Sequence, residues 1–180
     1  MKKLFLFVLF ASLIVSCKKE EGMESATTSD NTKKVAPAEF ADAKYTEIGK
    51  KTLAEMASGD IDGWTANYAD NAKYYWNAGD SLIGKPAIDK YWRDRRMNVI
   101  ETISFKNDIW FPIKVNKPQQ AERDGVWLMG WYEVTAKYKG GSSMTQWMHI
   151  LYHFDNNDKI DAVNHFVDRV PIMAAIVQKK

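Results

Sequence analysis

The length, composition and charge of the chain predict one globular domain preceded by a leader and a tether. It has 180 residues, of which 46% are hydrophobic and only five are proline, enough for a sizeable core. Its 25 basic residues nearly balance its 23 acidic residues, so the charge gives no indication of nucleic-acid binding. The single cysteine, Cys17, precedes the predicted domain, which excludes from it a disulfide, a thiol nucleophile and a cysteine metal site.

Residues 1–16 are predicted to be a secretion signal. Two lysines precede an apolar run of 12 residues, Leu4 to Val15, which is shorter than the roughly 20 residues of a membrane-spanning helix. The run ends in Ile14-Val15-Ser16-Cys17, which resembles the lipobox of bacterial lipoproteins. That resemblance implies that Cys17 becomes the lipidated first residue of the mature chain. An ordinary signal peptide with an incidental cysteine is the alternative.

Residues 17–37 are predicted to be a disordered tether that follows the lipidated cysteine. They begin with Cys17-Lys18-Lys19-Glu20-Glu21 and have almost no apolar content. A lysine and acidic cluster at this place also resembles signals that send some lipoproteins to the outer face of the outer membrane, and a merely solvated linker is the alternative. We therefore expect a protein that is lipid-anchored in the bacterial cell envelope, at the outer membrane, with its side of that membrane left open.

The folded domain, residues 38–180, is predicted to begin with two helices. The first ends at Gly59 and has an apolar stripe at helical spacing, formed by Ala41, Tyr45, Ile48, Thr52 and Met56. Asp60 caps a second, short helix, whose apolar positions are Ile61, Trp64 and Tyr68. Asp70-Asn71 is predicted to turn the chain into a first strand at residues 72–77.

A third helix is predicted after a hairpin turn at residues 78–81. It begins at Gly84-Lys85-Pro86, with proline at its first position, and its buried residues are Ile88, Tyr91, Trp92 and Val99. Its other face carries four basic residues, Lys90, Arg93, Arg95 and Arg96. Such a face could bind an anionic ligand, but the interleaved Asp89 and Asp94 favour a solvated face.

Four longer strands are predicted after the helices. Residues 103–115 alternate between apolar and polar side chains, and Pro112 within them indicates an edge strand or a bulge. Three further runs between Val126 and Val170 alternate with strand period and are separated only by short turns, which is typical of an antiparallel meander. The order of elements predicts an α+β fold with the helices segregated from the main sheet.

Large side chains occupy both faces of the predicted meander, which is unusual for an antiparallel sheet with one solvated face. The helices can cover one face. The opposite face carries Trp127, Trp131, Trp147 and His149, and we expect these four residues to form a homodimer contact.

Four short motifs together resemble the SnoaL-like branch of the nuclear transport factor 2-like superfamily. They are Gly59-Asp60-Ile61-Asp62, residues 68–72 (YADNA), residues 83–88 (IGKPAI) and residues 154–160 (FDNNDKI). The resemblance covers residues 40–172. It implies a cone-shaped, strongly curved antiparallel sheet wrapped around three N-terminal helices, related to the cystatin-like folds, with a ligand cavity at the open end. This fold hosts isomerases, dehydratases, cyclases, epoxide hydrolases and non-catalytic proteins, so it does not fix an activity.

The same resemblance implies a largely aromatic cavity in this chain. The residues expected to line it are Tyr68, Tyr74, Trp76, Trp92, Tyr132, Met148, Ile150, Tyr152 and His165. Where the family's ketosteroid isomerases place a general-base aspartate, an oxyanion tyrosine and a neutral acid, this chain has Trp76, Thr52 and Ile150. The paired carboxylates and arginine of the family's epoxide hydrolases have no counterparts at cavity positions. Neither mechanism is therefore expected.

The three histidines give the remaining candidates for chemistry. His149 and His153 share a strand face, but their Cα atoms should be about 13 Å apart, too far for one zinc ion, so neither a metal nor another cofactor is expected. His165 should point into the cavity and can exchange a proton near neutral pH.

Three functions follow from these patterns. We rank first the binding of a small hydrophobic or aromatic molecule in the cavity. Second is an isomerase, dehydratase or cyclase with His165 as general base and Tyr68 or Tyr152 as hydrogen-bond donor. Third is a non-catalytic, dimeric interaction module that uses the outer face of the sheet.

Overall fold

The computed structural model describes residues 35–119 and 123–176. The predicted signal peptide, the lipidation site Cys17 and most of the predicted tether lie outside these residues. Within the described ranges, no helix is both long enough and apolar enough to cross a membrane.

The described chain forms an α+β domain built on one sheet. Its elements are β1 (Ala38–Phe40), α1 (Lys44–Ser58), α2 (Ile61–Ala66), β2 (Tyr68–Trp76), β3 (Ser81–Ile83), α3 (Lys85–Asp94), the π-helix η1 (Arg95–Val99), β4 (Ile100–Val115), β5 (Gly125–Tyr138), β6 (Ser143–Phe154), β7 (Ile160–Phe166) and α4 (Arg169–Ile176). The seven strands lie in the order β1-β4-β5-β6-β7-β2-β3. The predicted antiparallel sheet has one exception, because β2 pairs with β7 in parallel.

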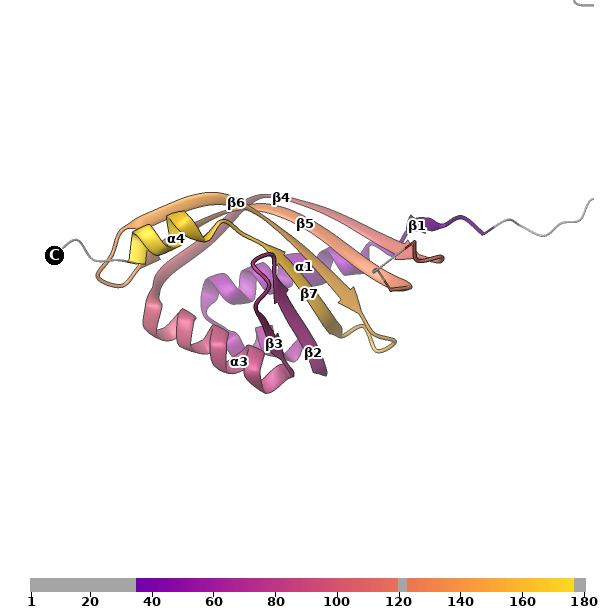
Figure 1. The fold of residues 1–180 in the computed structure, drawn as a ribbon, viewed down its shortest axis with the longest axis horizontal. Helices are drawn as coiled ribbons and strands as arrows, with labels where there is room; N and C mark the ends of the chain where they lie inside the picture. The colour runs from indigo at the N-terminus through magenta and orange to yellow at the C-terminus, as the bar shows by residue number, and fades with distance from the viewer. Residues whose placement is uncertain (1–34, 120–122, 177–180) are drawn as a thin grey trace, which may run out of the picture. The chain divides into compact units, whose positions relative to one another are not determined.

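The sheet is strongly curved, and its concave face encloses the helices. Figure 1 shows the long strands β4 to β6 arching over α1 and α3, with the short C-terminal helix α4 beside one end of the arch. At that end the backbone N–H of Ser142 donates to the carbonyl oxygen of Ala175 at 3.1 Å, which ties the β5–β6 turn to α4. The cone shape predicted from the family resemblance is therefore the shape of this domain.

The first two helices begin and end through local chemistry that the sequence indicated. Gly59 ends α1 in the left-handed conformation, with φ of 85°, and its N–H donates to the carbonyl oxygen of Glu55 at 3.0 Å. Asp60 caps α2 through its carboxylate, which accepts the N–H of Gly63 at 2.9 Å. The start of α1 differs from the prediction, because residues 38–40 pair with β4 as the short strand β1.

The chain enters β2 earlier than predicted. Tyr68 was expected on the second helix and Asp70-Asn71 in a turn, but all three residues belong to β2. Between Tyr68 and Lys73 the pairing of β2 with β7 shifts register, so the turn-forming residues Asp70 and Asn71 lie at an irregularity inside the strand.

A bulge in β4 moves several apolar residues to the outer face. The pairing with β5 passes from Lys106 opposite Glu133 to Ile109 opposite Trp131, which leaves one extra residue on β4, and Asn107 has φ of 55°. One extra residue moves the following side chains to the opposite face of the sheet. Ile109 is consequently 47% exposed, although simple alternation from residue 103 predicted it on the same face as Ile103 and Phe105, which pack against the core.

The last predicted strand is shorter than expected. It was predicted to run to Val170 but ends at Phe166, and α4 follows. Asp168 begins this helix, because its carboxylate accepts the N–H of Val170 at 2.9 Å. The result is a fourth helix that the strand-like pattern of residues 160–170 concealed.

Candidate ligand-binding cavity

A cavity of about 240 Å³ lies inside the cone. Its wall is formed by residues from α1, α2, β2, α3, η1, β4 to β7 and α4, and most of these side chains are apolar or aromatic. Two exposed side chains of the wall, Asp80 in the β2–β3 turn and Met173 on α4, mark the mouth. The cavity is therefore closed by the sheet and the helices and open between the hairpin and α4.

Eight of the nine residues expected in the cavity do line it. They are Tyr74, Trp76, Trp92, Tyr132, Met148, Ile150, Tyr152 and His165. Tyr68 does not, because it begins β2 and its ring packs against Trp64 at a centroid distance of 4.6 Å. Thr52, expected where the family's isomerases carry a tyrosine, also lines the wall.

His165 is held inside the wall by Tyr74. It is 5% exposed, and its Nδ1 lies 2.7 Å from the Tyr74 hydroxyl. Its Nε2 has no hydrogen-bond partner among the residues that the structure describes. Burial, assisted by the charges of His149 and Arg169, lowers the pKa of His165 to about 3. The imidazole is thus neutral at physiological pH, and a group so weakly basic is poorly matched to general-base catalysis.

Trp92 lies at the centre of an aromatic cluster. Its ring centroid is 5.8 Å from that of Tyr74, 6.5 Å from that of Trp76 and 6.5 Å from that of His165. Within the described chain its Nε1 also lacks a hydrogen-bond partner. Unpaired buried N–H groups are rare in native proteins, and a functional role is one explanation for them.

The tyrosine hydroxyls of the wall stay protonated. Burial raises the pKa of Tyr74 and Tyr132 well above the usual value near 10, and it raises the pKa of Tyr152 to about 12. The Tyr152 hydroxyl lies 3.5 Å from that of Thr52. Tyr132 and Tyr152 can donate hydrogen bonds to a ligand, and none of the three hydroxyls can act as a base near neutral pH.

Three charged residues of the wall were not foreseen as cavity residues. Arg169 donates through Nη2 to both carboxylate oxygens of Asp80, at 2.8 and 2.7 Å, and its guanidinium carbon lies 5.5 Å from the centroid of the Trp76 ring. This ion pair holds the pKa of Asp80 below its usual value. The Asp168 cap followed by Pro171 in the first turn was the available signal for α4, and hence for Arg169 near the mouth.

Arg95 is the third charged residue, and its predicted place on a solvated helix face was wrong. It is half-buried and lines the cavity. The regular helix α3 ends at Asp94, and the wider π-helical turn that follows changes the direction in which successive side chains point. Of the other predicted solvated residues, Arg96 donates to the carbonyl oxygens of Met56 and Ala57.

The other two histidines lie on the outer face and have structural partners. His153 is buried, with Nδ1 2.5 Å from Asp161 Oδ1 and Nε2 2.9 Å from the Asp124 carbonyl oxygen. His149 stacks on Trp131 at a centroid distance of 4.3 Å. Across residues 35–119 and 123–176, no group of three His, Cys, Asp or Glu side chains is arranged to hold a metal ion.

Comparison with known proteins identifies the fold but not an activity. No family model and no curated protein matches this sequence. A protein of Xanthomonas campestris provisionally named a polyketide cyclase aligns at 13% identity with a TM-score of 0.58, over 73% of this chain and 96% of that one. A ketosteroid isomerase-like protein of Catenulispora acidiphila, solved with trimethylamine, aligns at 16% identity with a TM-score of 0.56, over 74% and 94%.

The description of a third solved structure names the fold. It is a protein of unknown function from Burkholderia pseudomallei, described as NTF2-like, which aligns at 12% identity with a TM-score of 0.55 over 73% of this chain and 96% of that one. Identities this low establish the shared fold alone. The described domain therefore has the nuclear transport factor 2-like fold, which the SnoaL-like proteins share.

Proposed function

We propose that this domain binds a small hydrophobic or aromatic molecule in its cone and is held at the bacterial outer membrane by lipid on Cys17. The observation that carries the binding function is the cavity of about 240 Å³, whose wall combines aromatic rings with two ring nitrogens that lack partners in the described chain, Trp92 Nε1 and His165 Nε2. Apolar walls with a few fixed polar groups are typical of small-molecule sites.

The cavity volume limits the size of the ligand. A protein cavity of about 150 Å³ is enough to admit benzene. The space inside the cone, about 240 Å³, therefore suits a molecule with one or two fused rings, held by stacking and by a few hydrogen bonds from tyrosine and tryptophan.

An isomerase, dehydratase or cyclase remains the second candidate, and its support is weaker. It would require His165 as the base, yet burial lowers the pKa of this residue to about 3. The wall has Trp76, Thr52 and Ile150 at the positions expected to carry catalytic groups in the family's isomerases. If His165 were nevertheless the base, His165→Phe would lower turnover by about 100- to 10,000-fold. Loss of one hydrogen bond to a bound ligand would change affinity by only about 0.5 to 1.5 kcal/mol.

Filling the cavity tests the binding function. We expect 2-naphthol to quench tryptophan fluorescence saturably, because Trp76 and Trp92 line the cavity. Ile150→Trp, or the milder Ala136→Leu, should abolish or strongly weaken this binding in a folded protein. The matched control is Leu151→Trp, which adds an indole at the neighbouring residue, on the opposite face of β6. Absence of saturable binding in the wild type, together with native mass spectra free of a co-purified molecule, would contradict the proposal.

The membrane anchor rests on the sequence around Cys17. Covalent acyl chains contribute about 0.8 kcal/mol per buried methylene, and stable anchoring takes more than one chain or a second signal. Cys17→Ala should release the protein from membranes in a fractionation experiment. A Cys17→Ala protein that still sediments with the outer membrane would exclude this anchor.

We also propose that the outer face of the sheet binds a second copy of the chain. Four rings form a row across β4 to β7, with neighbouring centroids 6.0, 4.3 and 5.4 Å apart, in the order Phe111, Trp131, His149 and Phe166. Trp147 on the same face is 52% exposed. Trp127 packs on His153 and donates from Nε1 to the Arg123 carbonyl oxygen. Exposed aromatic patches of this kind are typical of interfaces. Sedimentation should detect a dimer that Trp131→Glu dissociates.

A further inference from the structure

We infer that the cavity selects aromatic carboxylates, and that Arg95 binds the carboxylate while the ring occupies the apolar part of the cone. This inference rests on the proposed binding function and adds a ligand class and a specificity-determining residue to it. It starts from the charges of the cavity wall.

The wall carries one uncompensated positive charge. Its charged residues are Asp80, Arg95 and Arg169, and Asp80 forms an ion pair with Arg169 at 2.7 Å. Arg95 forms no ion pair and no side-chain hydrogen bond with any residue that the structure describes, although it is half-buried. The lining histidine, His165, is neutral. A guanidinium beside a low-dielectric cavity, with its five N–H donors unused by the protein, is an electrostatic site for an anion.

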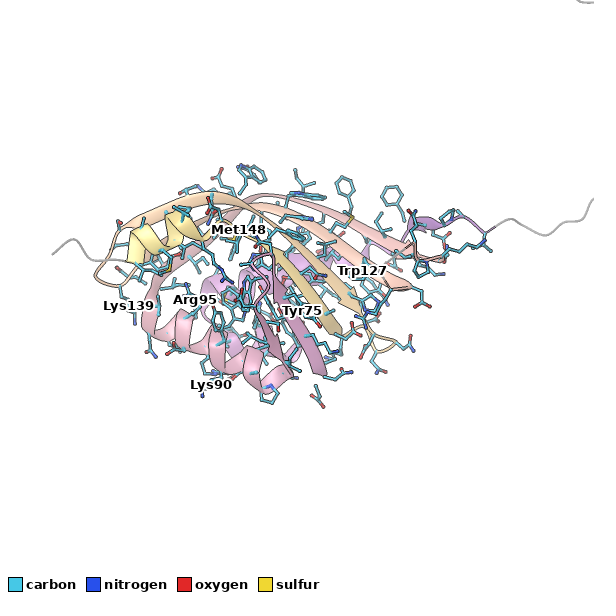
Figure 2. All side chains as sticks on the ribbon, in the orientation of Figure 1. Tyr75, Lys90, Arg95, Trp127, Lys139 and Met148 are labelled. Atoms are coloured by element: carbon cyan, nitrogen blue, oxygen red, sulfur yellow. The ribbon has the colours of Figure 1, made fainter. Side chains whose placement is uncertain are left out.

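Arg95 is also held in place for such a contact. Its guanidinium carbon lies 5.7 Å from the centroid of the Tyr91 ring, within the range of a cation–π interaction. Figure 2 shows the labelled Arg95 between α3 and α4, on the concave side of the sheet, whereas Lys90 of the same helical segment points away from the sheet. The ring of Tyr91 therefore supports the guanidinium from one side and leaves its N–H groups available.

The cavity wall offers a second hydrogen-bond donor. Tyr138 lines the cavity, and its hydroxyl forms no hydrogen bond with the described residues. Burial raises the pKa of Tyr138, and the charge of Arg95 opposes that rise, so the two groups are electrostatically coupled. A carboxylate can accept more than one such hydrogen bond, because each of its oxygens accepts two.

The opposite ligand class is disfavoured by the same charges. Aromatic rings such as Trp76 and Trp92 can surround an ammonium ion through cation–π interactions. A cation in this cavity would face the unpaired Arg95, and the carboxylate of Asp80 is already held by Arg169. Arg95 therefore attracts an anionic ligand and repels a cationic one.

The volume of the cavity and the solvent accessibility of Arg95 agree with an aromatic carboxylate bound at Arg95. The volume, about 240 Å³, accommodates one or two rings, and the ring-lined part of the wall includes Trp76, Trp92 and Tyr132. Arg95 is partly accessible to solvent, so a carboxylate bound there keeps part of its hydration. The desolvation cost that opposes buried ion pairs is reduced accordingly.

The test compares an acid with its uncharged isostere. The probes are 2-naphthoate and 2-naphthamide, titrated by calorimetry at pH 7.5 into the wild type, Arg95→Gln and Lys90→Gln. Lys90→Gln is the matched control, since it removes one positive charge from an exposed site on α3 outside the cavity. We expect the wild type to bind naphthoate about 10- to 100-fold more tightly than the amide, the range of a charge-assisted hydrogen bond.

The ratio of the affinity for naphthoate to the affinity for naphthamide tests the inference. In Arg95→Gln it should fall to near one, and in Lys90→Gln it should stay at the wild-type value. An equal affinity of the wild type for naphthoate and naphthamide would overturn the inference and leave the proposed binding function intact. This comparison uses the wild type alone, so it does not depend on whether a variant folds. A ratio unchanged by Arg95→Gln, or tighter binding of a trimethylammonium compound than of naphthoate, would also overturn it. Failure of both naphthyl probes to bind would overturn the inference, and together with native mass spectra free of a co-purified molecule it would contradict the binding function itself.

Discussion

The two faces of the sheet use similar residues in opposite ways. On β5, Tyr132 points inward and is buried against the cavity, whereas its neighbour Trp131 points outward and stacks on His149. On the concave face burial isolates polar groups from water, so that His165 is neutral and the tyrosine pKa values are raised. On the convex face rings such as those of Trp147 and Phe166 remain accessible. Aromatic content alone therefore does not assign a role, and the side of the sheet does.

The largest expected effect comes from placing a charge on each face in turn. Tyr132→Glu puts a carboxylate into the apolar interior, and we expect it to cost more than about 4 kcal/mol and to unfold the domain at room temperature. Trp131→Glu, one residue away, should leave the monomer folded while it disrupts the proposed dimer. Circular dichroism and urea unfolding of both variants give the comparison. If Tyr132→Glu were as stable as Trp131→Glu, the concave face would not be shielded from water.

A second, smaller effect is expected from acid. Because the pKa of His165 is about 3 in the folded state and near 6.5 when unfolded, the unfolded chain binds more protons between these values. The contribution of His165 to the free energy of unfolding is therefore complete above about pH 6.5 and is lost as the pH falls toward 3. The loss should be on the order of a few kcal/mol.

Unfolding curves at pH 7, 5.5 and 4 measure this slope, and two variants locate its source. His165→Phe removes the titrating group and should flatten the slope. His149→Phe removes an imidazole from the convex face, keeps His165 and should keep the slope. A His165→Phe protein with the same loss of stability between pH 7 and 4 as the wild type would contradict the assignment.

The smallest effect concerns the Tyr74–His165 hydrogen bond. His165→Phe leaves the buried Tyr74 hydroxyl without its partner, which should cost about 1 to 3 kcal/mol. Tyr74→Phe should cost a similar amount, and the double variant less than the sum of the two. A double-mutant cycle on unfolding free energies measures this coupling. Strict additivity would mean that the two side chains do not interact in solution.

Several parts of the site could be read from the sequence because they depend on local chemistry. Gly59 and Asp60 set the end of one helix and the start of the next. Strict alternation placed the inward residues of β5 and β6, and eight of the nine expected cavity residues line the cavity. The family resemblance added the cone, which alternation alone does not determine.

What the sequence determined by itself was the caps and the alternation of the long strands, since each is encoded within a few neighbouring residues, and the α+β class, which follows from the order of the elements. The aromatic character of the cavity was implied by the family resemblance. The tertiary structure alone decided where that alternation is interrupted. The bulge at Asn107 moved Ile109 outward, and the π-helical turn after Asp94 brought Arg95 to the wall. The tertiary structure also decided the pairing of Arg169 with Asp80, 89 positions away in the chain. Such features arise where distant segments compete for the same space, and no local pattern records that competition.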